Sequence, residues 1–256
     1  MSVSGGMAIL RWAVRVAAAL YVVASLTPVV AGEGANDPIE PVNRGIFWFN
    51  GKLDDYIMTP AAKGWRWILP APARKSVTNF FQNLLTPIDF INNLLQVKFE
   101  RSGMTVARFG INSTVGILGL FDPATDWGLE RYREDFGQTL GFWGVPPGPY
   151  LVLPLWGPSN PRDTVGLAAD SFSTVYPWFI PFYYTLGSAG VGFVNARANV
   201  LTEVEELKRA SLDYYVAVRD AYLQRREAEV HDRTELSEEQ QRELYTIPSD
   251  EEESTP

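Results

Sequence analysis

The 256-residue sequence contains no cysteine and a single histidine, His231. The lack of cysteine excludes disulfides, zinc–thiolate sites, a thiol nucleophile and the lipidated cysteine that anchors lipoproteins. A single histidine excludes metal sites built from several histidines, and its charged C-terminal surroundings argue against a Ser-His-Asp triad. We therefore expect this protein to hold no metal and no cofactor.

Familiar catalytic and nucleotide-binding motifs are also missing. The chain has no glycine-rich phosphate loop, no dinucleotide fingerprint and no serine with glycines two positions before and after it. Carboxylate pairs do occur, and a glycosidase needs two carboxylates facing each other across a cleft. Helix caps or solvated charges are the more ordinary roles, so we expect no catalytic residues and a protein that is not an enzyme. The pairs are Asp54 with Asp55, Asp122 with Asp126, and Glu134 with Asp135.

Negative charge is concentrated at the C-terminus. The formal net charge is −8, and residues 234–256 contain eight acidic side chains and one arginine. The rest of the chain is therefore nearly neutral, without the basic surface that nucleic-acid binding requires. Because the C-terminal stretch is acidic, polar and poor in aromatic residues, we predict that 231–256 is a disordered tail.

The N-terminus has the features of an export signal. Arg11 and Arg15 precede an uncharged apolar run over 16–26, and small residues follow up to Ala31. This order predicts a signal peptide over 1–31, cleaved after Ala31, with a flexible leader over 32–37. An uncleaved anchor helix is the alternative, and in either case the folded domain lies outside the cytoplasm.

The body of the chain, 38–230, has the spacing of helices. Apolar residues recur at three and four positions from about 73 to 95, where we expect Pro87 to interrupt the helix, and again from 201 to 222. The later segment is one helix, or two joined near 211–213 with Ser211 as the cap of the second. No run of alternating apolar and polar residues predicts a strand.

Two long stretches, 137–161 and 171–196, contain no charged residue. Their lengths suit membrane spans, but the first holds six prolines and five glycines, and Pro177 and Pro181 interrupt the aromatic-rich start of the second. Irregular backbone at membrane depth requires cover by protein or a water-filled cavity. The stretches favour an interfacial or membrane-embedded protein with irregular hairpin segments, and buried loops of an ordinary core are the alternative.

Several motifs, in order from 37 to 226, resemble the MlaA (VacJ) family of outer-membrane lipid-transport proteins. They include DPIEPVNR at 37–44, FWFN at 47–50, NNLLQ at 92–96, EDFGQTLG at 134–141 and GPYLVLP at 148–154. The sequence departs from the family in one respect: most members are lipoproteins anchored through a cysteine, which this chain lacks.

The resemblance implies an all-α, ring-shaped, membrane-embedded domain on the periplasmic side of the outer membrane. Its function would be to remove mislocalised phospholipids from the outer leaflet through a pore and so maintain lipid asymmetry. Phospholipid, a trimeric outer-membrane porin and a soluble periplasmic lipid carrier would be its partners. A structural porin accessory that moves no lipid is the first alternative, and a periplasmic hydrolase using a carboxylate pair is the second.

Within the matching motifs we select three sets of candidate residues. Polar candidates for the lipid path are Asn43, Arg44, Asn50, Asn79, Asn83, Asp135, Gln138, Arg162 and Asp163, with Arg44 and Arg162 suited to phosphate. Helix caps and salt bridges are the alternative roles for this set. Candidates for membrane or acyl-chain contact are Phe47, Trp48, Phe49, Trp143, Trp178, Phe179 and Phe182, with core packing as the alternative. Candidate hinge residues are Gly141, Gly144 and Gly148.

Overall fold

The computed structural model describes residues 37–174 and 181–233, and the predicted signal peptide and most of the predicted tail lie outside these ranges. The described chain is predominantly helical, which confirms the helical fold class. The helices are α2 (Glu40–Leu53), the π-helical turn η1 (Asp54–Met58), α3 (Thr59–Ile68), α4 (Ala71–Leu95), α5 (Phe99–Thr114), α6 (Pro123–Asp126), α7 (Phe136–Phe142), α8 (Pro161–Ser173), α9 (Phe182–Asn199), α10 (Leu201–Ala210) and α11 (Tyr214–Val230).

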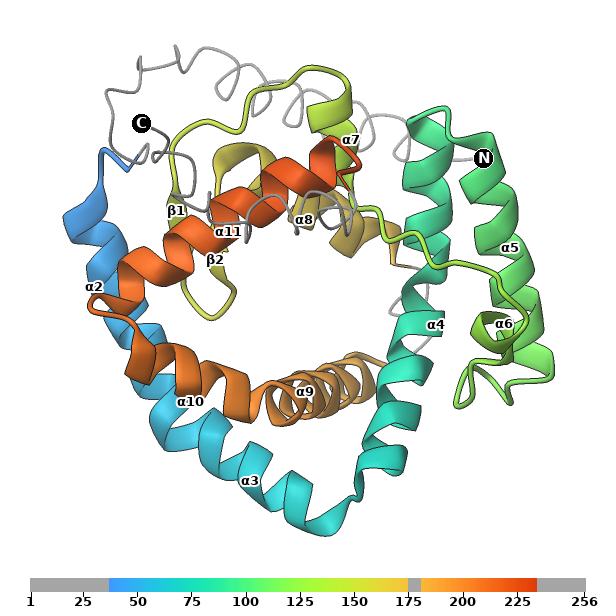
Figure 1. The fold of residues 1–256 in the computed structure, drawn as a ribbon, viewed down its shortest axis with the longest axis horizontal. Coiled ribbons are helices and arrows are strands. Elements are labelled where there is room, and N and C mark those ends of the chain that lie inside the picture. The colour runs from blue at the N-terminus through green and yellow to red at the C-terminus, as the bar shows by residue number, and fades with distance from the viewer. Residues whose placement is uncertain (1–36, 175–180, 234–256) are drawn as a thin grey trace, which may run out of the picture.

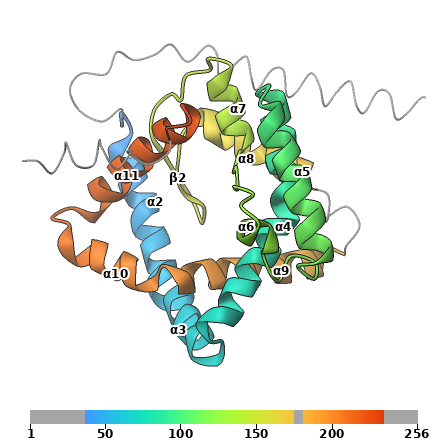
Figure 2. The same cartoon turned by 45° about the vertical axis from the view of Figure 1, so that its right-hand side comes forward.

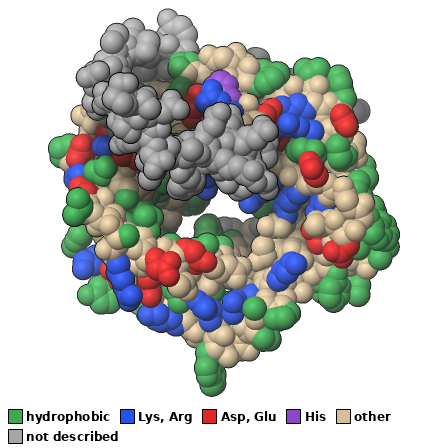
Figure 3. Space-filling model, viewed as in Figure 1, with side chains coloured by type: hydrophobic (Ala, Val, Ile, Leu, Met, Phe, Trp, Pro, Cys, Tyr) green, Lys and Arg blue, Asp and Glu red, His purple; other side chains and the backbone are tan. Residues whose placement is uncertain are grey.

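The helices follow one another around a central opening (Figure 1). Helices α2, α3 and α4 form three consecutive edges, and α9 packs against both α3 and α4. Helix α11 crosses to α7, which packs on α8, so the C-terminal helix closes the path (Figure 2). The space-filling view shows that side chains leave the centre of this face open (Figure 3).

The first uncharged stretch contains a short hairpin that the sequence pattern did not predict. Strands β1 (Leu151–Leu153) and β2 (Gly157–Ser159) pair antiparallel, with Val152 opposite Pro158. Strands this short have too few residues for the alternation that identifies a strand in a sequence. In the second stretch, α9 begins at Phe182 and continues through three glycines, so this part is more regular than we expected.

Two helix boundaries differ from the sequence predictions. Helix α4 runs unbroken through Pro87, although proline costs about 3 kcal/mol inside a helix. Helix α4 contacts α5 and α9 before the proline and α7 after it, and this packing offsets the cost. Helix α11 is capped by Asp213, whose Oδ1 accepts from the Tyr215 and Val216 N–H groups, whereas Ser211 donates back to Leu207.

Burial is inverted relative to an ordinary soluble domain. Among the described residues, nineteen buried residues are polar or charged and nine are apolar. On α4, for example, Asn83, Asn92 and Asn93 are buried, whereas Leu94 and Leu95 are exposed. The apolar stripe of this helix therefore includes an outward-facing part, and hydrogen bonding holds much of the interior together. No helix within the described ranges is long and apolar enough to cross a bilayer.

We predict that the contact between α7 and α8 tolerates no added atom at Gly166. A Cβ there would lie 2.3 Å from the Gly137 backbone nitrogen, so Gly166→Ala forces the two helices apart. The free energy of unfolding should fall by about 1–3 kcal/mol. Gly64→Ala in α3 is the matched control, because its Cβ would meet no atom within 4 Å, and it should stabilise the helix by about 0.5–1 kcal/mol. Thermal unfolding of both variants tests this, and equal stabilities would contradict it.

Candidate functional site

A polar cavity of about 560 Å³ lies between α4, α7, α8 and the C-terminal half of α11, which border the opening in Figure 1. Its wall carries charges of both signs beside three aliphatic side chains. Such a lining can hold a ligand with both charged and apolar parts. The charged residues are Asp89, Arg131, Arg133, Glu134, Asp135, Asp170, Arg225, Arg226 and Glu229, and the aliphatic ones are Leu85, Ile88 and Leu167.

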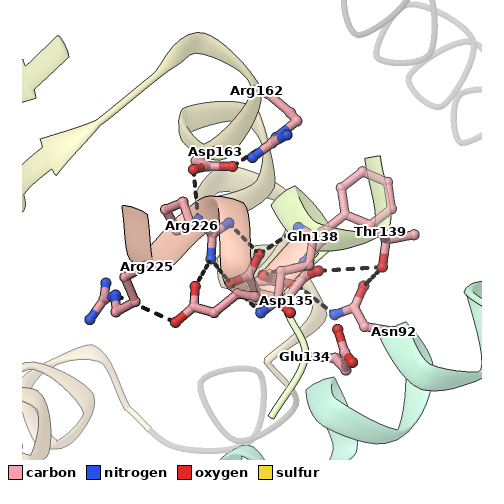
Figure 4. Close-up of polar contacts among 12 residues, drawn as sticks. Asn92, Glu134, Asp135, Gln138, Thr139, Arg162, Asp163, Arg225 and Arg226 are labelled. Carbon is pink, nitrogen blue, oxygen red and sulfur yellow. Dashed lines mark hydrogen bonds and ion pairs between the residues drawn. The ribbon is translucent and has the colours of Figure 1, made fainter. Parts of the chain in front are cut away.

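Arg226 joins three helices beside this cavity (Figure 4). Its two terminal nitrogens donate to both carboxylate oxygens of Asp135 at 2.7 and 3.0 Å, and its Nε donates to Asp163 at 2.8 Å. Asp135 is the N-cap of α7 and Asp163 lies in the first turn of α8, so one guanidinium ties α11 to both. The side chains of Arg226 and Asp163 are 10% and 9% exposed, so their bond forms largely out of contact with water, whereas Asp135 is 38% exposed.

Asp163 accepts hydrogen bonds from four side chains. Besides Arg226, these are Arg162 at 3.0 Å, Asn160 at 2.7 Å and the Tyr222 hydroxyl at 2.6 Å. Burial raises the pKa of Asp163, but the hydrogen bonds and charge of Arg226 outweigh it and lower the pKa to about 2. Burial also raises the pKa of Asp135, but the hydrogen bonds and charge of Arg226 outweigh it, so the pKa of Asp135 is lowered. Both carboxylates are therefore anionic at neutral pH.

Four of the nine lipid-path candidates thus belong to one cluster, because Gln138 also donates to Asp135. Arg162 is 5% exposed and bound to Asp163, which leaves it in the interior. Arg226 is not among the candidates selected from the sequence. Its spacing provided a signal, since it lies four residues after Tyr222 and therefore on the apolar face of α11.

A second buried network links α4 to α7 and to the segment that precedes it. Asn92 accepts from the Thr139 hydroxyl at 2.8 Å and donates to Asp170 at 3.2 Å. Gln96 donates to Glu134 at 2.9 Å, and Lys98 closes an ion pair with the same carboxylate. Asn92 and Gln96 are four residues apart and therefore share one face of α4. This spacing is visible in the sequence, although the two residues are not among the selected candidates.

Two other candidates, Asn43 and Asn50, hold the β-hairpin against α2. The Asn43 amide donates to the Tyr150 carbonyl at 3.0 Å and accepts from the Val152 N–H at 2.9 Å. Asn50, further along α2, makes the equivalent pair of bonds: its amide donates to the Leu153 carbonyl and accepts from the Leu155 N–H. Each amide bonds to the hairpin backbone as a neighbouring strand would. Because the two asparagines are seven residues apart, they lie on one face of α2 and together hold the hairpin against it.

The remaining polar candidates lie elsewhere. Arg44 is part-exposed, pairs with Glu40 and Asp213 at 2.7 Å each, and stacks 4.4 Å from the Tyr215 ring centre. These hydrogen bonds raise its pKa further above its ordinary value. Asn79 and Asn83 line a separate small polar cavity between α4 and α5. The nine candidates therefore lie in several separate clusters, and their role in a lipid path stays a prediction.

Each carboxylate pair selected from the sequence has at least one member in an ion pair or cap, whereas Asp126 of the second pair is exposed. Asp54 binds Arg197 through both oxygens at 2.6 and 2.9 Å, and Asp122 binds Arg108 in the same manner while capping α6. The third pair belongs to the networks described above. This supports the ordinary structural roles.

The apolar candidates divide by exposure. Phe47 packs 5.4 Å from the rings of both Tyr214 and Tyr215, in the core of the α2–α11 contact. Trp48 and Trp143 are 65% and 52% exposed, and Phe49 is exposed as well. The last three candidates cannot be assigned: Trp178 and Phe179 lie outside the described residues, as does the side chain of Phe182.

The three glycines selected as hinges have different surroundings. Gly144 and Gly148 follow α7 with φ of +86° and +73°, the left-handed region that glycine adopts without strain. Gly141 lies inside α7, where a Cβ would come within 2.9 Å of both Val230 and Arg162. Gly141 therefore permits close packing of α7 against α11 and α8.

Asp89 is a buried carboxylate with an incomplete set of partners. It is 8% exposed, accepts from the Glu134 N–H at 3.4 Å, and lies 3.8 Å from Arg131. Burial raises the pKa of Asp89 to about 6 despite the opposing charge of Arg131. Burial also lowers the pKa of Arg131. For both partners, therefore, the cost of removing the charge from water exceeds the attraction between the two charges.

We predict that Arg226→Ala strongly destabilises the protein. The substitution leaves Asp135 and Asp163 without their main cation, and breaking one partner of a buried pair costs about 3–5 kcal/mol. Arg225→Ala is the matched control, because this side chain is 69% exposed and makes one ion pair among the described residues; its cost should be about 0–1 kcal/mol. Chemical unfolding of the two variants tests this. Similar losses in both would show that Arg226 does not hold these helices together.

We predict that Asp89→Asn stabilises the protein at neutral pH. The Asp89 carboxyl loses its proton near pH 4 in the unfolded chain and near pH 6 in the folded protein. Protonated Asp89 therefore favours folding below about pH 4, and this stabilisation is lost as the pH rises from about 4 to about 6. Removing the charge should therefore raise the free energy of unfolding at pH 7, on the order of 1–3 kcal/mol, and flatten its pH profile between 4 and 6. The exposed Asp126→Asn serves as control. Lower stability of Asp89→Asn at pH 7 would contradict the prediction.

Known proteins share sequence similarity with most of this chain. The family model for the MlaA lipoprotein matches residues 35–229. An uncharacterized protein of Rickettsia conorii is 42% identical over 199 residues, covering 76% of this chain and 78% of that protein. The intermembrane phospholipid transport system lipoprotein MlaA of Escherichia coli is 36% identical over 197 residues, covering 75% and 78%.

The fold agrees with this relationship. A solved structure that concerns the structural basis for maintenance of bacterial outer membrane lipid asymmetry matches with a TM-score of 0.68 and 36% sequence identity. The match covers 76% of this chain and 98% of that chain. With most of the described domain matched in sequence and in structure, this chain belongs to the MlaA family.

Proposed function

We propose that this protein transports phospholipid between membranes, removing mislocalised phospholipids from the outer leaflet of the outer membrane and passing them to a carrier in the periplasm. Membership of the MlaA family supports this function. The observation that carries it is the inverted burial, in which polar side chains are gathered inside and large apolar side chains face outward. A phospholipid has a charged head and apolar tails, so its path requires a polar interior within an apolar exterior.

The arrangement of helices suits a ring embedded in one leaflet. Large apolar side chains face outward on the α2–α3 edge, including Trp48 and Trp67 at 65% and 88% exposure, and on α5, including Phe99 and Phe109. Aromatic side chains of this kind favour the boundary between lipid and water. A domain of this form can reside in the leaflet without a spanning helix.

The anchoring of this protein must differ from that of its lipoprotein relatives, because the chain has no cysteine to carry lipid. Exposed apolar side chains over several helices bury area in the membrane, at about 25 cal/mol per Å² of apolar surface. We infer that the body of the protein supplies much of its attachment. The proposed location is the periplasmic side of the outer membrane.

Two protein partners complete the proposal. Transport to another membrane requires a periplasmic carrier that shields the acyl chains from water, and a trimeric porin is the proposed membrane partner. Asp54, Asp122 and Asp135, one member of each candidate carboxylate pair, are held in ion pairs, which favours transport over the hydrolase alternative. The structural-accessory alternative differs from transport only in its effect on lipids.

We predict that a Gram-negative strain lacking this gene accumulates phospholipid in its outer leaflet and becomes more sensitive to detergent with a chelator. Outer-leaflet phosphatidylethanolamine, labelled with a membrane-impermeant amine reagent, should rise several-fold and return to normal on expression of the full chain. Gly166→Ala, expected to be poorly folded, should restore less than Gly64→Ala. Unchanged lipid asymmetry in the deletion strain, together with co-purification of the wild-type protein with a porin, would instead support the structural accessory.

A further inference from the structure

The cavity between α4, α7, α8 and α11, here called the central cavity, is lined by one cation that has no hydrogen bond or ion pair within the ranges that the structure describes. Among the described residues, every other charged side chain lining this cavity has a hydrogen bond or ion pair, including Arg131 with Gln82, Arg225 with Glu229, and Asp170 with the Phe136 N–H. Arg133 has no such partner within the described ranges. The cavity thus presents a guanidinium whose donors are available.

Arg133 lines the cavity from a segment that has no regular secondary structure. It lies in the irregular segment 129–135 between α6 and α7, which passes along α4 beside the opening in Figure 2. Its charge acts on the cavity wall, since it lowers the pKa of Asp89 and of Arg131. Arg133 is exposed, so a ligand can reach it without displacing an existing ion pair.

The chemistry around Arg133 selects a particular kind of ligand. A guanidinium binds the oxygens of a phosphate through paired N–H donors. Leu85, Ile88 and Leu167 line the same cavity, and its volume of about 560 Å³ lies within the common range for ligand pockets, about 300–1,000 Å³. A phosphate attached to an apolar body fits this combination better than a free anion does.

We propose that Arg133 contacts the phosphate of the phospholipid head group as the lipid occupies the central cavity. This role rests on the proposed transport function. It replaces the assignment of head-group binding to Arg44 and Arg162, whose guanidinium groups are held by Glu40, Asp213 and Asp163.

The test is direct lipid binding by the purified full-length chain in detergent. Two ligands carry the same fluorescent acyl chains: phosphatidylglycerol, which has the phosphate, and diacylglycerol, which lacks it. Arg133→Gln should weaken phosphatidylglycerol binding at least fivefold and leave diacylglycerol binding unchanged within twofold. Arg133→Lys should recover part of the binding, because it restores the charge without the paired donors. Arg209→Gln on α10, exposed and outside this cavity, is the matched control and should bind like the wild type.

The other outcomes separate this proposal from the proposed function. Wild-type binding of both lipids with no effect of Arg133→Gln would overturn the role of Arg133 and leave transport intact. No binding of either lipid by the wild type would count against the proposed function, and the head-group role would fall with it. If inorganic phosphate alone binds in calorimetry through Arg133 while lipid binding does not depend on this residue, a free anion is the ligand and the proposal is wrong. Equal thermal unfolding of all variants controls for folding.

Discussion

Hydrogen bonding between polar groups in the interior is the constraint on which the rest of this structure depends. A buried polar group without a partner costs about 1–3 kcal/mol, and more when it is charged. Most buried residues here are polar, so the helices must meet where donors find acceptors. Arg226 illustrates the result, since one side chain satisfies two carboxylates and thereby fixes the mutual positions of α7, α8 and α11.

The same constraint explains how a fold with a small apolar core stays together. Asparagines on α2 fix the hairpin, and amides on α4 connect to α7, each through specific side-chain bonds. Large apolar side chains are thereby left exposed, where the proposed lipid environment would stabilise them. An interior built in this way can also line an opening with polar groups. These groups pair with one another, so they leave few unsatisfied hydrogen-bond donors or acceptors.

Within that lining, the difference between paired and unpaired charges separates structure from recognition. Arg226 in the lining and the nearby Arg162 are both held by Asp163, and Arg226 joins the helices that form the cavity wall. Arg133 on the neighbouring segment has no such partner among the described residues, and this availability is what suits it to a ligand. Residue type alone does not distinguish these roles, since all three are arginines near the same cavity.

The sequence by itself determined the helical class, the near-neutral body with an acidic end, and the family, because composition, periodicity and motif order are properties of the chain. Only the tertiary structure decided which polar residues meet. Pro87 stays within α4 because packing on both sides outweighs a local cost, and Arg162 is buried because Asp163 and α7 surround it. Partners such as Arg226 and Asp135 are 91 residues apart in sequence, and pairing over such a distance is set by the closure of the helices around the opening rather than by any local pattern.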